Sequence, residues 1–157
     1  MKKILLTTVL FMGLYTGSAL SQPVSVVGLP IKFDDSIEVV KTTLRTTMEP
    51  EEATSAGQRN TKQLRLKTKG IWVFFDKTGH VMNIRLDAPF AGNIGGVRIG
   101  DSIVLLEKTL GKPAKLLKMG IQLPDRNDPY LYYIDDITTA RFDFDRDGQI
   151  ETIFLFK

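Results

Sequence analysis

Cysteine is absent from all 157 residues, and this absence excludes several kinds of site. Disulfide bridges, thiol nucleophiles, zinc–thiolate centres and a lipid anchor on an N-terminal cysteine all need a thiol. Histidine occurs once, as His80, so no histidine pair exists to bind a metal. The chain also has no G-x-S-x-G nucleophile motif and no phosphate-binding GK[ST] motif. We therefore expect a protein that is not an enzyme and that has no cofactor.

Long apolar runs are also scarce. The sequence has one, and it lies at the N-terminus. Lys2 and Lys3 precede an apolar segment over residues 4–15, and small residues follow it. This pattern is typical of a secretory signal peptide and is too short for a membrane span. The pattern predicts a signal over residues 1–21, cleaved after Ser21 or alternatively after Ala19. We expect a soluble periplasmic protein without stable membrane insertion.

Excess charge of one sign is lacking once the predicted signal is removed. The full chain has 21 Lys+Arg and 18 Asp+Glu, and removal of Lys2 and Lys3 leaves a net charge of +1. A nucleic-acid-binding domain usually has a strong basic excess. The predicted partner is therefore a protein of the cell envelope and not nucleic acid, and the oligomeric state is left open.

The chain contains an internal repeat. Residues 72–87 align with residues 141–156, so that Phe75 matches Phe144 and Gly79 matches Gly148. Residues 31–44 align in the same order with residues 97–110. Two matches at nearly the same offset indicate duplication of one structural unit. The predicted organisation is one compact domain of two units, residues 22–88 and 97–157, joined by a linker over residues 89–96.

Hydrophobic periodicity gives the expected elements of each unit. A helix is predicted from Asp35, with Glu38 completing a capping box, to about Thr47, and a second helix from Asp101 or Ser102 to Leu110. Strands are predicted over residues 63–69, 71–75, 80–86, 130–134, 138–144 and 149–156. Residues 48–60 and 112–129 are predicted as loops or short second helices. The expected fold class is α+β: a tandem repeat of a helix-(loop-helix)-three-stranded antiparallel sheet unit, with the helices on one sheet face.

The repeated segments resemble those of two families of exported proteins. The segments that carry the resemblance are the helix starts at residues 34–36 and 100–102, residues 110–113, and the strand–turn segments 75–79 and 144–148. Together they resemble the β-lactamase-inhibitor-protein-like (BLIP-like) fold, and single units resemble the SmpA/OmlA-type outer-membrane assembly lipoproteins. The first resemblance implies an inhibitor that binds another protein, and the second implies an envelope assembly factor.

Strand alternation predicts an aromatic surface on the sheet face away from the helices. The repeat aligns Trp72 and Phe74 with the polar residues Arg141 and Asp143. The same parity argument places four more aromatic side chains there: Tyr130, Tyr132, Phe154 and Phe156. Clustered exposed aromatic residues are typical of binding surfaces. Burial is the alternative, either by packing of the two sheets on each other or by cover from the N-terminal segment.

A row of basic residues is predicted beside this face. Arg65, Lys67 and Lys69 alternate with Leu64 and Leu66. Such a row is usually a solvated strand face that discourages aggregation at a sheet edge. Its alternative role is contact with an acidic surface of the partner.

The last hairpin contains a weak candidate for a metal site. Asp143, Asp145 and Asp147 precede Gly148 with the spacing of the first half of a calcium-binding loop. The bidentate glutamate required at position 12 is replaced by Phe154. Because a hairpin turn already accounts for aspartate and glycine, we favour a turn over a metal site.

The sequence is compatible with three functions. The first is a protein-binding module that inhibits an envelope hydrolase or acts as an immunity protein against a toxin. The second is an envelope assembly or scaffolding factor, and the third is a calcium-binding protein that uses the Asp143–Asp147 turn.

Overall fold

The computed structural model describes residues 24–53, 61–118 and 127–157. The predicted signal peptide, residues 1–21, lies outside the described residues, as do parts of the two predicted loops. Within the described ranges no helix has the length and apolar character that a membrane span requires.

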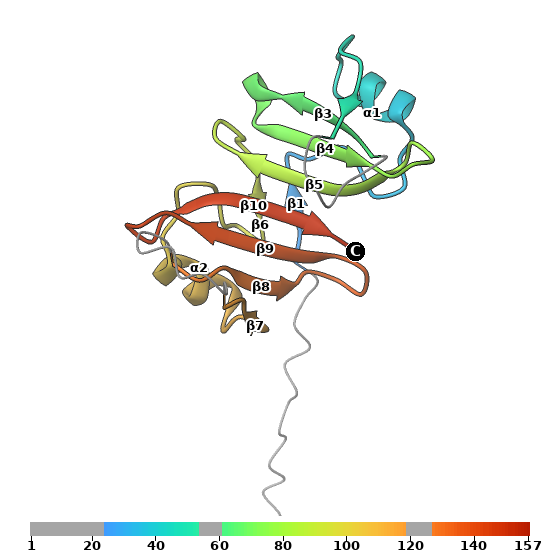
Figure 1. Ribbon diagram of the computed structural model, residues 1–157. Coiled ribbons are helices and arrows are strands. Elements are labelled where there is room, and N and C mark those ends of the chain that lie inside the picture. Colours follow the sequence, from blue (N-terminus) through green and yellow to red (C-terminus); the bar gives the residue numbers. More distant parts are fainter. Residues whose placement is uncertain (1–23, 54–60, 119–126) are drawn as a thin grey trace, which may run out of the picture.

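An antiparallel sheet of eight strands forms the body of the molecule (Figure 1). Its strand order is β2-β3-β4-β5-β10-β9-β8-β7. The bounds are β2 Glu51–Glu52, β3 Lys62–Leu66, β4 Ile71–Phe75, β5 Val81–Asp87, β10 Ile150–Phe156, β9 Thr139–Phe144, β8 Tyr130–Tyr133 and β7 Lys115–Leu116. A second sheet pairs β1, Val26–Val27, with β6, Asn93–Ile94.

The central pair of strands, β5 and β10, joins the two halves of the chain. They pair antiparallel in continuous register, from Asp87 opposite Thr152 to Asn83 opposite Phe156. This pairing connects residues about 65 positions apart in sequence, since Thr152 and Asp87 differ by 65. The two groups of strands are therefore parts of one sheet.

The predicted fold class, an α+β tandem of helix–sheet units, is wrong. The described part of the chain is mostly β, with two short α-helices, α1 Ile37–Thr43 and α2 Ile103–Leu110, and the 3₁₀ turn η1 Lys67–Lys69. The described residues after each helix form two-residue edge strands, β2 and β7, where short second helices were an expected alternative. The physical reason for the wrong fold class is the pairing of β5 with β10, which joins the strands of both halves into one large sheet. Helix α1 is also shorter than predicted, because Arg45 adopts a left-handed φ of 49°, which an α-helix cannot continue.

The six long strands were predicted nearly at their observed positions. The largest error is at β3, which ends at Leu66 because residues 67–69 turn back as η1. Gly70 then adopts a φ of 64°, and a Cβ there would lie 2.1 Å from the Asp87 carbonyl oxygen. Only glycine fits this turn without strain. The predicted linker over residues 89–96 also contains strand β6.

Each helix begins at a serine that is held by the hairpin of its own half. The N-cap is Ser36 and not Asp35, because the Asp35 carboxylate accepts instead from the Lys32 amide. Ser102 caps α2, and its Oγ accepts from the Leu105 amide at 3.2 Å. The first helical amides donate to hairpin glycines: Ile37 N to Gly79 O at 3.1 Å, and Ile103 N to Gly148 O at 2.9 Å.

The hydrophobic core lies on one face of the sheet, under the helices. It includes Phe75, Phe142 and Phe144 from the strands, and Val40 and Leu106 from the helices. Residues on the opposite face alternate with these along each strand. We call this opposite face the outer face. It contains Arg65 on β3, Trp72 and Phe74 on β4, Arg85 on β5, Phe154 and Phe156 on β10, and Arg141 on β9.

Candidate binding surface

A line of alternating arginine and aromatic side chains crosses the outer face. The cross-strand pairs are Arg65 with Trp72, Trp72 with Arg85, Arg85 with Phe154, and Phe154 with Arg141. These five residues, which we call the Arg–aromatic row, lie on five adjacent strands. Directly opposed residues of antiparallel strands have neighbouring Cβ atoms, so sheet register alone brings the side chains into contact.

Each guanidinium of the row stacks on at least one ring. Arg65 and Arg85 lie 4.7 and 4.5 Å from the Trp72 ring centroid. Arg85 and Arg141 lie 5.6 and 4.1 Å from the Phe154 centroid. These distances lie in the range of favourable cation–π contacts. All five side chains are partly exposed, so the row is accessible to a ligand.

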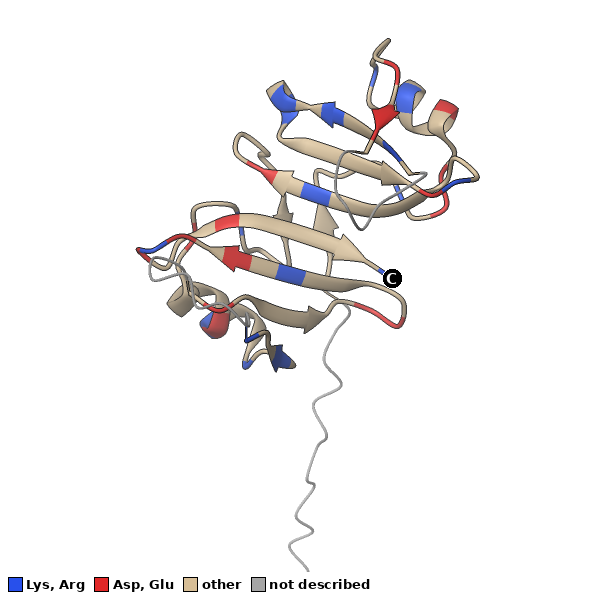
Figure 2. Ribbon diagram, in the orientation of Figure 1, with Lys and Arg blue, Asp and Glu red and all other residues tan. Residues whose placement is uncertain are grey.

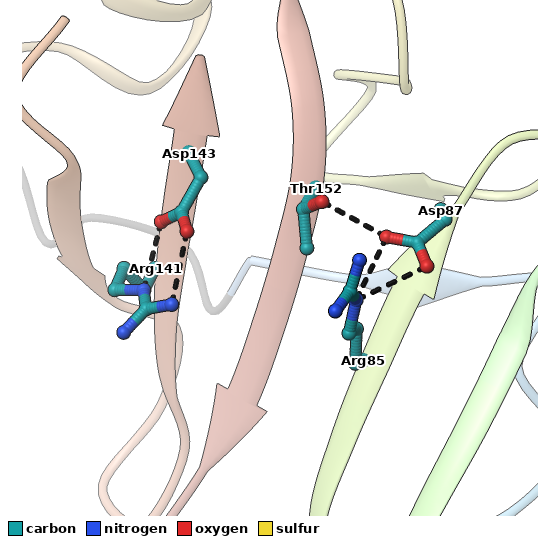
Figure 3. A network of polar contacts seen from close by, with 5 residues as sticks. All are labelled: Arg85, Asp87, Arg141, Asp143 and Thr152. Atoms are coloured by element: carbon teal, nitrogen blue, oxygen red, sulfur yellow. Dashed lines mark hydrogen bonds and ion pairs between the residues drawn. The ribbon is translucent and has the colours of Figure 1, made fainter. Parts of the chain in front are cut away.

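Two carboxylates, each two residues further along the same strand and therefore on the same face, orient the guanidiniums of Arg85 and Arg141 (Figure 3). Arg85 Nε lies 3.0 Å from Asp87 Oδ1, and Thr152 Oγ1 donates to the same oxygen at 2.9 Å. Arg141 donates twice to Asp143, at 2.8 and 2.9 Å. Bidentate pairing fixes the planar guanidinium more firmly than a single hydrogen bond. The arginines are thus held before any partner arrives.

The Arg–aromatic row carries little net charge. Arg65 Nε lies 3.2 Å from Glu51 Oε1, so each of the three arginines has one acidic neighbour. The surface therefore offers planar aromatic and guanidinium groups with compensated charge. This chemistry suits a protein surface better than a polyanion.

A second line of residues runs beside the row, through Phe74, Asn83 and Phe156. Phe156 is partly exposed, whereas Phe74 is 7% exposed. The strand register places Trp72, Phe74, Phe154 and Phe156 on one face of the sheet. Phe74 nevertheless offers little surface to a partner. Packing of two sheets on each other, one expected form of burial, does not occur, because both halves form one sheet.

The expectation that Tyr130 and Tyr132 share the outer face is wrong. Their partners are Phe142 and Ala140, which belong to the core. Tyr132 is 5% exposed, and its hydroxyl donates to the Gly111 carbonyl at 3.0 Å. Burial raises the pKa of Tyr132 to about 12 and also raises that of Tyr130. Leu131 and the exposed Tyr133 take the outer face of β8 instead.

The predicted basic row is not continuous. Arg65 lies on the outer face, but Lys67 and Lys69 belong to the turn η1 at the end of β3. Lys69 Nζ donates to the Leu44 carbonyl near the end of α1. A groove of about 640 Å³ runs between this turn and residues 45–51. Figure 2 shows lysine and arginine along β3 and its turn, with the acidic residues of β2 beside them.

The three aspartates of the last hairpin have separate tasks. Asp143 pairs with Arg141 on β9, while Asp145 Oδ1 accepts from the amides of Asp147 and Gln149 at 2.9 and 2.8 Å. The first hairpin repeats this turn, because Asp76 Oδ1 accepts from the amides of Thr78 and His80. The His80 amide and the Thr78 side chain hold the Asp76 pKa below its usual value. Within the described ranges no group of three or more acidic or histidine residues is placed to bind a metal.

Arg85, Asp87 and Thr152 contribute to this surface but are not among the residues predicted from the sequence. A signal for Arg85 was present: Ile84 and Leu86 point into the core, so the residue between them must point outward. Nothing local indicated that β5 would pair with β10. Without that pairing, the alternation of arginine and aromatic residues is not visible in the sequence.

Comparisons with known proteins add little to the interpretation of this surface. No protein-family model matches the chain, and no curated protein matches it significantly. One solved structure that is similar is that of a DUF4309 family protein (YjgB) from Bacillus subtilis subsp. subtilis str. 168. Its TM-score is 0.48 at 17% sequence identity, over 78% of each chain.

Proposed function

We propose that this protein is an exported protein-binding module that blocks an envelope hydrolase or a toxin through the outer face of its sheet. The Arg–aromatic row is the observation that carries the proposal. Export to the periplasm rests on the N-terminal sequence pattern. The inhibitor or immunity class rests on the sequence resemblance to BLIP-like proteins.

The composition of the row suits a protein interface. Tryptophan, tyrosine and arginine are the residues most enriched among interface hot spots. Trp72, Phe154 and the three arginines lie side by side at the centre of the sheet, on five neighbouring strands. Each of the three arginines already has a carboxylate beside it, so a partner that covers the row does not bury an unpaired guanidinium.

Preorganisation also favours binding. A free arginine side chain loses rotamer entropy when it is immobilised, at a cost of about 0.5–1.5 kcal/mol for each side chain. Arg85 and Arg141 are already fixed between a ring and a carboxylate in the free protein. Much of that cost is therefore met on folding, and a partner gains more from each contact.

The experiment is affinity capture of the tagged mature protein from an envelope extract, with identification of the eluted proteins by mass spectrometry. The double variant Trp72→Ala/Phe154→Ala removes both rings that stack on the arginines. The control is Val104→Ala on the exposed side of α2, away from the sheet. Circular dichroism verifies that each variant is folded.

We expect one near-stoichiometric hydrolase or toxin to be captured by the wild type and the control, and to be lost with the double variant. Equal capture by the folded double variant would show that the outer face is not the binding surface. Recovery of outer-membrane barrel components in place of a hydrolase or toxin would reject inhibition in favour of envelope assembly.

A further inference from the structure

The two edges of the eight-stranded sheet are covered differently. Asp87 N donates to Gly70 O at 2.9 Å, so Asp87 and Arg85 turn their backbone groups toward β4. Hydrogen-bonding groups of alternate residues point to the same edge of a strand. Trp72 therefore faces β5, and Arg65, its partner on β3, turns its N–H and C=O away from β4.

Among the described residues, no strand lies beside the outward backbone groups of Arg65. Strand β2 covers β3 only from Lys62 to Gln63, the residue opposite Glu51. Over the described part of the chain, no backbone hydrogen bond outside the sheet reaches Arg65. Its Nε is also buried without a hydrogen-bond partner, although Glu51 Oε1 lies 3.2 Å away.

The other half of the molecule covers the matching position. In the second half, Leu131 on β8 is the cross-strand partner of Arg141. In the first half, Arg65 on β3 is the cross-strand partner of Trp72 in the same way. Strand β7 pairs with Leu131 through Lys115, and the Leu131 carbonyl accepts from the Ala114 amide at 2.8 Å. The fold is thus able to cover this position, and at Arg65 it leaves the position open.

A positively charged groove lies at the open edge. Its volume is about 640 Å³, and its cations are Arg45, Arg65, Lys67 and Lys69. The groove also contains Glu49 and Glu51, but Glu49 pairs with Lys41 and Glu51 with Arg65. Across the described residues, the side chains of Arg45 and Lys67 have no ion pair. The groove therefore has a surplus of unpaired positive charge.

We propose that this groove binds an extended acidic segment of the partner, which adds a strand to the sheet beside β3. The inference rests on the proposed function, because it names the part of the partner that extends beyond the outer face. The backbone of the added segment pairs with the N–H and C=O of Arg65. The carboxylates of the added segment form ion pairs with Arg45 and Lys67. Because Arg65 is also the first residue of the Arg–aromatic row, a segment bound beside Arg65 brings the rest of the partner next to that row.

The probe is an acetylated, amidated hexapeptide of alternating valine and glutamate, titrated into the mature protein. Trp72, the only tryptophan, reports binding by fluorescence because Arg65 stacks on it. We expect saturation with a Kd below about 1 mM, together with slowed hydrogen exchange of the Arg65 amide. The matched glutamine peptide should bind at least about tenfold more weakly, since it lacks the charge.

Two further tests separate charge from strand addition. The double variant Arg45→Glu/Lys67→Glu should bind the glutamate peptide at least about tenfold more weakly than the wild type does. The control Lys112→Glu/Lys115→Glu makes the same charge change at the other edge and should change affinity by less than about twofold. Among peptides N-methylated on either all valines or all glutamates, one set should fail to bind, because only one edge of an added strand donates to β3.

Some results would overturn the inference. These are no saturation, equal binding of the two peptides, equal loss in both double variants, or equal binding of both methylated sets. Concentration-dependent dimerisation that protects the Arg65 amide without any peptide would assign the edge to a second copy of the chain. If Trp72→Ala/Phe154→Ala loses the captured partner but Arg45→Glu/Lys67→Glu retains it, the proposed function stands and this inference fails. If both variants retain the partner, the proposed function fails.

Discussion

At the scale of single residues, the main feature is an arginine held between an aromatic ring and a carboxylate. Arg141 stacks on Phe154 and pairs with Asp143 on its own strand. A partly exposed cation–π contact contributes about 0.5–1 kcal/mol. A surface ion pair contributes a similar or smaller amount. Together they give a side chain that is rigid yet accessible, which is the state that a binding residue needs.

Replacement of Trp72 tests whether the row contributes to stability. Trp72→Ala removes two cation–π contacts and a large partly buried ring, and we expect it to lower the free energy of unfolding by about 2–4 kcal/mol. Trp72→Phe keeps a ring between the arginines and should cost less than about 1.5 kcal/mol. Urea unfolding followed by circular dichroism measures both. Equal losses for alanine and phenylalanine would show that ring stacking contributes nothing.

Tyr132 gives the protein a sensitivity to alkaline pH. Burial raises the pKa of its hydroxyl to about 12, against an ordinary value of 10.0. Folding therefore favours the neutral phenol: the stabilisation is complete below pH 10 and is lost as pH rises toward about 12. Tyr132→Phe removes the hydrogen bond to the Gly111 carbonyl and should cost about 1 kcal/mol at pH 7.

The same variant should also lose part of the alkaline destabilisation. We expect its free energy of unfolding to fall less steeply than that of the wild type between pH 10 and 12. Urea midpoints across this range provide the comparison, with Tyr133→Phe at an exposed position as the control. Parallel pH profiles for wild type and Tyr132→Phe would contradict the assignment.

Alternation along the sequence predicted the direction of some side chains and not of others. For Trp72 and Phe154 the direction follows from the repeat, which aligns Trp72 with the polar residue Arg141 and aligns Ile84 and Leu86 with the neighbours of Phe154. Strand β8 reads Tyr-Leu-Tyr-Tyr, and every position is apolar or aromatic. With no polar residue to mark the solvent side, its sequence does not determine which face is buried, and Tyr130 and Tyr132 were placed on the wrong one.

At the scale of elements, the two hairpin turns are small structural units that carry the helices. Asp145 Oδ1 accepts two backbone amides, and the turn it stabilises presents the Gly148 carbonyl to the first amide of α2. Asp76 and Gly79 do the same for α1. The aspartate–glycine spacing that resembles a calcium loop is therefore needed by the turn itself.

Neighbouring alanine variants distinguish a turn from a metal site. Asp145→Ala leaves two amides unpaired and should lower the free energy of unfolding by about 1–3 kcal/mol. Asp147→Ala removes an exposed carboxylate and should change it by less than about 0.5 kcal/mol. Thermal melting with and without calcium measures both effects. A calcium-induced rise in Tm that both variants abolish would restore the calcium hypothesis.

Element length explains which elements the sequence could predict. Strands of four or more residues show alternation or a run of β-branched and aromatic residues, and these were located to within a few residues. Strands β1, β2, β6 and β7 have two residues each, which is too short for any period. They exist because neighbouring backbone is available for pairing. Helix α1 was predicted to extend to about Thr47, but it ends at Thr43, before the left-handed Arg45. Helix α2 ends at Leu110, as predicted.

At the scale of the whole molecule, the seam between β5 and β10 determines both the fold and the composition of the outer face. It converts two groups of strands into one sheet and joins Arg85 to Phe154, which completes the Arg–aromatic row. The fold class was predicted wrongly because this pairing is long-range. The sequence of each half predicts the strands of that half. No local pattern indicates that β5, the last strand of the first half, pairs with β10, the last strand of the second half.

A single core spanning the seam predicts that the two halves unfold together. Trp72, the only tryptophan, lies in the first half, and Tyr130, Tyr132 and Tyr133 lie in the second. Fluorescence of Trp72 and near-ultraviolet absorbance of the tyrosines therefore follow the halves separately. Because buried residues of both halves form one cluster, we expect both probes to give the same urea midpoint.

A substitution at the seam should shift by the same amount the urea midpoints that Trp72 fluorescence and tyrosine absorbance report. Ile153 on β10 is fully buried opposite Leu86 on β5, and Ile153→Ala should lower the free energy of unfolding by about 2–5 kcal/mol. Val104→Ala, exposed on α2, is the control and should change it by less than about 0.5 kcal/mol. If Ile153→Ala shifted the tyrosine signal alone, the halves would be separate folding units. The Arg–aromatic row would then lie across a joint between two independent bodies, and its rigidity could not come from the sheet.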